Sequence, residues 1–275
     1  FTEEDGMYNA VPILNPITED FPLMRTTLIP TLMDVLVRNQ AVKNESVAIY
    51  EIAPVYRPKQ LPLTELPEQE MYVTGLLYGN RTAGQWPNKA ERYDFYDVKG
   101  IVEAILEGLG VTADLEVSDF APLHPGKAAR FVKDGQVICD FGELHPKALD
   151  NYDVEGPVYI FELHLDAIMK HINLLPDYHK VAKFPAIHRD LAFLAPIDTK
   201  NAEIVSVLKE KGGDYLEGVY LFDLYQGKQV PQGFKSLAYA LKFRSSEGTL
   251  TEQDIEGPIA DMIEELKNRL HCELR

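Results

Sequence analysis

Cysteine is scarce in this sequence, which has only Cys139 and Cys272 among 275 residues. The two lie far apart and in no C-x-x-C spacing, which argues against a disulfide framework and fits a reducing cytoplasm. Each is better explained as a small buried hydrophobic residue. We therefore expect a cytoplasmic protein whose core holds together without cross-links.

Long apolar runs are missing as well. No stretch reaches the roughly 18 uninterrupted apolar residues that a membrane helix needs, and the first residues lack the basic and apolar pattern of a signal segment. We expect no membrane contact. Because the sequence begins at Phe1 rather than at Met, we also expect a fragment of a longer protein.

The usual motifs of catalytic sites are absent too. Phosphates are commonly held by a glycine-rich turn that enters a helix, whereas "EGLG" (107–110) lies where a helix ends. In "HPGKAAR" (124–130), Gly126, Lys127 and Arg130 could hold an anion, but repeated glycines are lacking. The histidines show no zinc-binding spacing, and no G-x-S-x-G turn presents a nucleophile. We expect no catalytic residue and no metal site in this chain.

Basic residues are few relative to acidic ones: 27 Lys and Arg stand against 43 Asp and Glu, a net charge of −16. Such a charge normally argues against nucleic-acid binding. The excess of acids is uneven, however: residues 182–275 hold 12 Lys and Arg against 15 Asp and Glu, a net charge of −3. Six of those acids fall within residues 249–265, which contain no base. The strands before that segment are therefore near neutral, so the overall charge does not exclude a local basic patch there.

The chain is expected to form two domains, because residues 169–190 contain two prolines and no clean period between two strand-like runs. We place the boundary near residue 180, with domains at 1–180 and 181–275. In the first domain we expect a helix at 29–42, strands at 46–57 and 72–79, a helix at 98–109 and a hairpin at 129–142. Asp134-Gly135 suits a type I′ turn in that hairpin.

The second domain shows the order β-α-β-β-α-β of a ferredoxin-like fold, in which both helices cover one face of an antiparallel sheet. Asp198 or Thr199 is expected to cap the first helix, and Pro258 to kink the second or delay its start. In "GFKSLAYALKFRSS" (233–246), the alternate large residues form the covered face. The expected elements are strands at 189–196, 217–226 and 233–246, helices at 199–211 and 251–270, and a last strand in "CELR".

Matching stretches run through the whole chain and resemble the C-terminal part of the phenylalanyl-tRNA synthetase beta-subunit family. The stretches include "NPITEDFPLMRTTLIPTLMDVLVRN" (15–39), "YEIAPVYR" (50–57), "FPAIHRDLAFL" (184–194), "LFDLYQG" (221–227) and "KSLAYALKF" (235–243). The resemblance implies an α+β protein: an inactive class II synthetase-like antiparallel core, then a ferredoxin-fold anticodon-binding domain.

The resemblance also implies partners. The chain would pack on a catalytic alpha subunit in an alpha2beta2 heterotetramer, bind tRNA, and belong to a ligase that uses ATP and magnesium. No cofactor is expected in this fragment itself. Arg57 ends a strand near the place of an ATP-binding arginine in active class II enzymes. Without a partner arginine loop, we interpret Arg57 as structural or interfacial.

The sheet face that both helices leave open is the predicted RNA interface. Recognition of single-stranded RNA needs space for a base, hydrogen bonds to its edge and cations near phosphates. The tRNA contacts of the family carry over to Ala192, Asp223 and Ser236, which stand in matching motifs. With their neighbours, the predicted tRNA-binding residues are Arg189, Asp190, Ala192, Asp223, Tyr225, Ser236, Lys242 and Arg244.

Several alternatives stay open. Tyr225 could simply pack, Asp223 could be an ordinary edge-strand charge, and Lys242 and Arg244 could belong to a solvated face. A ferredoxin-like domain that regulates by binding a small metabolite would respond to free phenylalanine but not to tRNA. A complete synthetase would exchange ATP and pyrophosphate on its own, which the missing phosphate loop argues against.

Overall fold

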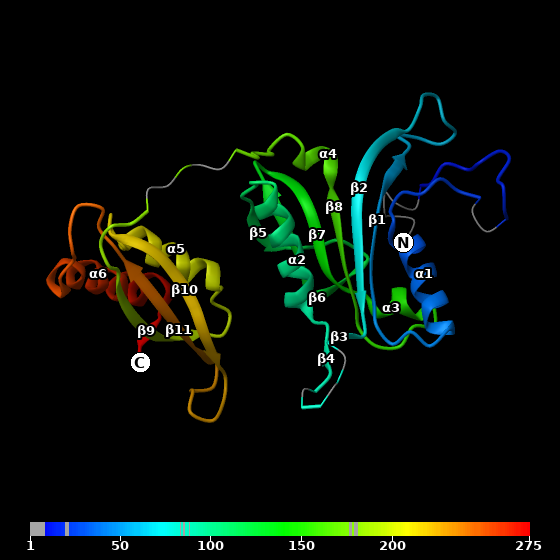
Figure 1. Cartoon of the computed structure of the whole chain (residues 1–275). Helices are drawn as coiled ribbons and strands as arrows, with labels where there is room; N and C mark the ends of the chain where they lie inside the picture. The colour runs from blue at the N-terminus through cyan, green and yellow to red at the C-terminus, as the bar shows by residue number, and fades with distance from the viewer. Residues whose placement is uncertain are drawn as a thin grey trace. The chain divides into compact units, whose positions relative to one another are not determined.

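The computed structural model describes residues 9–19, 22–82, 84, 86–87, 89–175, 178 and 181–275. The chain divides into two compact units, Phe1–Asp177 (unit 1) and Tyr178–Arg275 (unit 2), whose helices and strands are labelled in Figure 1. The predicted boundary at residue 180 lies outside the described residues. None of the described helices is both long enough and apolar enough to cross a membrane.

Unit 1 is built on a six-stranded antiparallel sheet with the order β1-β2-β8-β7-β6-β5. In the predicted hairpin, Asp134 and Gly135 have φ angles of 49° and 78°, as a type I′ turn requires, which confirms that prediction. The strands of the six-stranded sheet are β1 (Val47–Arg57), β2 (Glu68–Tyr78), β5 (Asp114–Val117), β6 (Leu123–Lys133), β7 (Gln136–Leu144) and β8 (Val158–His164). A separate two-stranded sheet consists of β3 (Asn80–Thr82) and β4 (Glu91–Arg92).

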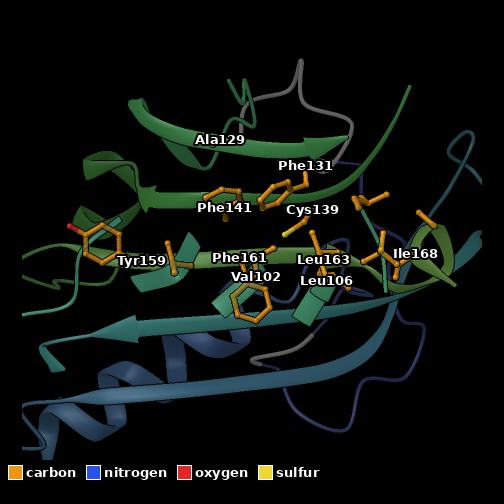
Figure 2. Close-up of a cluster of buried hydrophobic side chains, with 14 of the residues drawn as sticks. Val102, Leu106, Ala129, Phe131, Cys139, Phe141, Tyr159, Phe161, Leu163 and Ile168 are labelled. Carbon is orange, nitrogen blue, oxygen red and sulfur yellow. The ribbon is translucent and has the colours of Figure 1, made fainter. Parts of the chain in front are cut away.

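Helices cover both faces of this sheet. On one face, α2 (Phe95–Gly108) and α4 (Leu165–Ile168) bury a cluster that contains Phe131, Phe141 and Phe161 (Figure 2). On the other face, α1 (Ile29–Ala41) and α3 (Pro146–Asp150) pack on a second cluster. The Asp94 side chain caps α2 by accepting hydrogen bonds from the backbone N–H groups of Tyr96 and Asp97.

Unit 2 confirms the predicted β-α-β-β-α-β order. Its four-stranded sheet has the order β10-β11-β9-β12, and every pair is antiparallel. The first and third strands are therefore central and adjacent, as in a ferredoxin-like fold. The elements are β9 (Ile187–Pro196), α5 (Asn201–Lys211), β10 (Leu216–Tyr225), β11 (Phe234–Phe243), α6 (Glu252–Leu270) and β12 (Glu273–Leu274).

The two helices of unit 2 cover one face of its sheet. Apolar residues of α5 and α6, such as Leu208 and Leu266, form one cluster with the large side chains of β11, which are Leu237, Tyr239, Leu241 and Phe243. We call the opposite side of this sheet the open face. The predicted division of residues 233–246 into a covered face and an open face is therefore correct.

At the helix ends of unit 2, one predicted cap is corrected and one of the two alternatives for Pro258 is excluded. At α6, the Asp254 carboxylate accepts a 2.7 Å hydrogen bond from the backbone N–H of Thr251, completing a capping box. Because α6 begins at Glu252, Pro258 lies inside the helix and does not delay its start. At α5, the N-cap is Lys200 rather than Asp198 or Thr199, because the Glu203 carboxylate accepts from its N–H at 2.8 Å.

Candidate nucleic-acid interface

The open face carries a row of residues that crosses all four strands of unit 2. Asp223 of β10 lies opposite Ala238 of β11, and Ala238 lies opposite Ala192 of β9. The backbone N–H of Arg275, just beyond β12, donates to the Ala192 carbonyl at 2.9 Å. Directly opposed residues of a sheet share a face, so an acid and a cation flank two alanines, Ala192 and Ala238, which we call the alanine floor.

Ser236 lies in the next row, between Tyr225 of β10 and Leu194 of β9. Although it is on the open face, Ser236 is only 5% exposed. Its hydroxyl accepts a 3.3 Å hydrogen bond from Nη1 of Arg275. A ligand on this face would therefore meet the Arg275 guanidinium before it met Ser236, one of the predicted tRNA contacts.

Lys242 and Arg244, predicted as phosphate contacts, share one carboxylate. Nζ of Lys242 and Nε of Arg244 lie 2.7 and 2.6 Å from the two carboxylate oxygens of Glu217. The hydrogen bond from Lys242, with that from Arg244, holds the pKa of Glu217 below its usual value. These ion pairs are partly exposed and individually weak, so the two cations are neutralised without being fixed in place.

Arg189 does not lie on the open face. It is opposite Leu241, whose side chain is in the covered core, and its guanidinium pairs with Glu252 at the start of α6. The reason is strand alternation, since residues 189, 191 and 193 of β9 all face the helices. Asp190, in contrast, lies on the open face opposite Ala240.

Sequence reasoning missed an aromatic side chain on the open face. Strict alternation would place Tyr220 and Asp223 on opposite faces, but a bulge between Leu221 and Asp223 shifts the register of β10. As a result, Tyr220 lies opposite Ala240 and shares the face of Asp223. Tyr220 and Tyr225 thus stand on either side of Asp223, and both are exposed enough for a base to stack on them.

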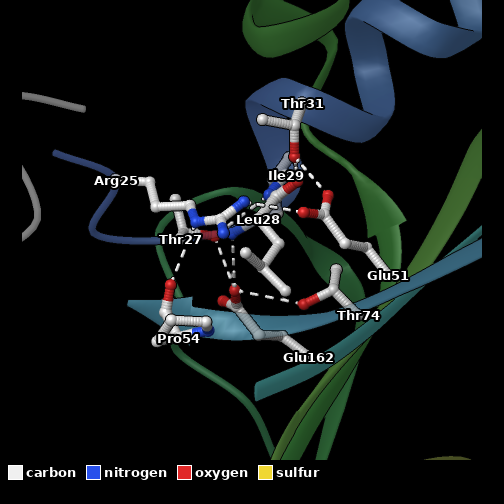
Figure 3. A network of polar contacts seen from close by, with 9 residues as sticks. All are labelled: Arg25, Thr27, Leu28, Ile29, Thr31, Glu51, Pro54, Thr74 and Glu162. Atoms are coloured by element: carbon white, nitrogen blue, oxygen red, sulfur yellow. Dashed lines mark hydrogen bonds and ion pairs between the residues drawn. The ribbon is translucent and has the colours of Figure 1, made fainter. Parts of the chain in front are cut away.

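Unit 1 also has polar side chains on a sheet face, the one that α1 packs against. One residue from each strand forms a row across the sheet, which we call the polar row: Glu51, Thr74, Glu162, Asp140, Arg130 and Glu116. Figure 3 shows how its first half binds the segment before α1. Arg25 donates to Glu51 at 2.7 Å, and the Thr27 hydroxyl donates to Glu162 at 2.6 Å.

Glu162 is the most deeply buried member of the polar row, with 1% exposure. Burial raises its pKa to about 7, although the hydrogen bonds from Thr27 and from the Leu28 N–H favour the charged form. Its second carboxylate oxygen, Oε2, has no hydrogen-bond partner among the described residues. The row thus joins α1 to the sheet through internal contacts.

Arg57 takes a structural place at the end of β1. Its guanidinium lies 3.4 Å from the Glu70 carboxylate and 5.3 Å from the centre of the Tyr72 ring. The His164 ring packs against the same Tyr72 ring, with the two ring centres 4.5 Å apart. Burial lowers the pKa of His164 to about 4, so this imidazole is neutral at pH 7.

The possible anion site at residues 124–130 does not form. This segment is part of β6, where Lys127 lies 2.7 Å from the Glu143 carboxylate and Arg130 pairs with Asp119. Residues three apart in a strand point to opposite faces. The two cations therefore diverge, and each already has an acidic partner.

Comparison with known proteins gives consistent matches along the chain. The family model described as the phenylalanyl tRNA synthetase beta chain CLM domain matches residues 1–165. The model of the ferredoxin-fold anticodon binding domain matches residues 182–275.

Two curated proteins illustrate the similarity. The phenylalanine–tRNA ligase beta subunit of Clostridium acetobutylicum is 38% identical and aligns with 99% of this chain and 33% of its own length. That of Syntrophotalea carbinolica is 35% identical, over 100% of this chain and 34% of its own. The chain thus spans about a third of these relatives. Among solved structures, a pyrrolysyl-tRNA synthetase from Desulfitobacterium hafniense has a TM-score of 0.44 and 12% identity, covering 62% of this chain and 55% of that one.

Proposed function

The chain belongs to the phenylalanyl-tRNA synthetase beta-chain family, and from this premise we propose that it is the non-catalytic C-terminal part of a phenylalanine–tRNA ligase beta subunit. Unit 2 binds the anticodon region of tRNA, and unit 1 supports the catalytic alpha subunit. The domains are then a class II synthetase-like core without an active site at 1–180 and an anticodon-binding domain at 181–275.

The observation that carries the RNA-binding role is the row across the open face. The alanine floor offers flat space to an unstacked base, and Asp223 stands at its edge with no partner among the described residues. A carboxylate can accept from both the N1–H and the amino group of guanine. We propose that Asp223 reads guanine at the first anticodon position, that Tyr225 stacks, and that Asp190, Lys242 and Arg244 line the approach.

The remaining features of the enzyme follow from this assignment. Catalysis, with ATP and magnesium, belongs to the alpha subunit, the assembly is an alpha2beta2 heterotetramer, and charging takes place in the cytoplasm. The internal use of the polar row and of Arg57 supports an unreactive unit 1, because their charged groups bind one another instead of facing a substrate.

Replacing Asp223 by alanine tests the RNA-binding role. We expect the full chain to bind tRNA with guanine at the first anticodon position about tenfold or more weakly, and to lose its preference over an adenine-substituted tRNA. Filter binding at fixed salt measures both affinities. Asp261→Ala removes the same charge from the helix side of unit 2 and should leave the preference intact. Equal preference in the wild type and Asp223→Ala would contradict the assignment.

The proposed contact of unit 1 with the alpha subunit is supported by an apolar strip on β1, an edge strand of the unit 1 sheet. Tyr50 and Ile52 point away from α1 and are 72% and 54% exposed. Exposed apolar strips on an edge strand usually mark protein contacts. We propose that this strip meets the alpha subunit.

Ile52→Lys is expected to weaken binding to the alpha subunit by about tenfold or more, since it would bury a charge in an apolar contact. Co-elution of the full chain with purified alpha subunit over a concentration series measures this. The matched control is Val117→Lys, at a 64% exposed position on β5 at the opposite edge of the sheet. If both variants co-elute as the wild type does, the strip is not the contact.

A further inference from the structure

We propose that Arg275 positions the bound RNA by donating to the phosphate of the nucleotide whose base lies on the alanine floor. This inference rests on the proposed function, and it adds Arg275 to the residues predicted to contact tRNA. Arg275 is a positioning residue for the backbone, whereas Asp223 reads the base.

The first observation is the placement of Arg275. Glu273 and Leu274 of β12 lie opposite Leu194 and Phe193 of β9, and the same register puts Arg275 opposite Ala192. The 2.9 Å hydrogen bond from the Arg275 N–H to the Ala192 carbonyl fixes this position. The guanidinium is therefore on the open face, next to the alanine floor.

The second observation is its partner. Among the residues that the structure describes, the Arg275 side chain donates only to the hydroxyl of Ser236, at 3.3 Å. A guanidinium has five N–H donors in a planar fork that matches carboxylate or phosphate. A neutral hydroxyl uses one donor and leaves the charge uncompensated. Since Ser236 is buried, it can hold the guanidinium in place while the other donors face outward.

The third observation is the contrast with the neighbouring cations. Within the described part of unit 2, Lys242 and Arg244 pair with Glu217, and Arg189 pairs with Glu252. An RNA phosphate would have to displace a carboxylate from each of these three cations. At Arg275 it would displace none, so the gain in Coulomb energy is largest there.

The geometry also sets the direction of the RNA. Neighbouring strands are about 4.8 Å apart, so three spacings, about 14 Å, separate the backbone of Asp223 from that of Arg275, with the alanine floor between them. An anionic phosphate is repelled by Asp223 and attracted by Arg275. The base edge therefore points to β10, and the sugar and phosphate lie over β9 and β12.

The test uses the full chain with Arg275→Ala, Arg275→Lys and a control, Arg269→Ala, at an exposed arginine of α6 that pairs with Glu210. Affinity for tRNA is measured over a range of salt concentrations, with guanine or adenine at the first anticodon position. We expect Arg275→Ala to bind about three- to tenfold more weakly at low salt, equally for both tRNAs. The slope of log affinity against log salt should fall by about 0.7, the loss of one phosphate contact.

Arg275→Lys keeps the charge and should restore the slope, and Arg269→Ala should change neither quantity. Circular dichroism confirms that each variant is folded. An unchanged slope and affinity in Arg275→Ala would overturn the inference while leaving the proposed function standing. Loss of the guanine preference alone would also overturn it, because Arg275 would then contact the base. Absence of tRNA binding by the wild type would instead refute the proposed function.

Discussion

Replacing Phe141 by alanine should lower the free energy of unfolding of unit 1 by about 3–5 kcal/mol. Phe141 is fully buried, and its ring stacks at 5.5 Å from Phe95 and 5.4 Å from Phe131. It therefore joins α2 to the strands β6 and β7 (Figure 2). Alanine would remove both ring contacts and leave a cavity that a closely packed core cannot fill.

The measurement must separate the two units, because they are expected to unfold in separate transitions. Hydrogen exchange at increasing urea, resolved by peptide, does this. In Phe141→Ala, peptides from β7 should lose protection at lower urea, while those from β9 keep theirs. Phe193→Ala is the matched control, since Phe193 is fully buried in unit 2 and should give the reverse pattern. Unchanged protection of β7 would contradict the central place of Phe141.

Glu162→Gln should stabilise unit 1 above pH 7, by up to about 3 kcal/mol, and have little effect near pH 4. The Glu162 carboxyl has an ordinary pKa of 4.5, which burial raises to about 7. The folded protein thus binds this proton more tightly than the unfolded chain. Its contribution is fully favourable below pH 4.5 and is lost as the pH rises to about 7. Glutamine resembles the neutral acid and can still accept from Thr27 at every pH.

Urea unfolding of unit 1 at several pH values measures the difference between wild type and Glu162→Gln, which cancels the other titrating groups. Glu116→Gln is the matched control, because Glu116 lies in the same polar row but is exposed on β5. It should show no such pH-dependent difference. A constant difference for Glu162→Gln between pH 4.5 and 8 would mean that Glu162 is not the titrating group.

Local patterns in the sequence predicted most of the fold. Alternation identified the covered face of β11, because each large residue there, such as Leu237 and Tyr239, has to be buried against a helix. The Asp134-Gly135 pair predicted its turn because few other residues tolerate the two positive φ angles. The start of α5 was predicted less well, because its N-cap residue, Lys200, is not a typical capping residue. The backbone N–H of Lys200 is instead bound by the Glu203 carboxylate.

The candidate site was only partly predictable, because it depends on contacts between distant residues. Asp223 and Ala192 were correctly predicted to share the open face of the sheet. The bulge in β10 was not visible, so Tyr220 was missed. Nothing local indicated that Arg275 covers Ser236, or that Glu217 and Glu252 pair with the predicted phosphate contacts. Such pairings are set by sheet register and helix placement.

The row on the open face takes one residue from each of β10, β11 and β9 and one from just beyond β12, and these strands do not follow the order of the chain. The site is therefore complete only when the final short strand has docked on β9. A molecule clipped between Cys272 and Glu273 would keep the buried cluster of unit 2, in which Cys272 is the last member. It would present Asp223 without its opposing cation, so proteolytic remnants of this kind should keep the guanine preference but bind tRNA more weakly, as expected for Arg275→Ala.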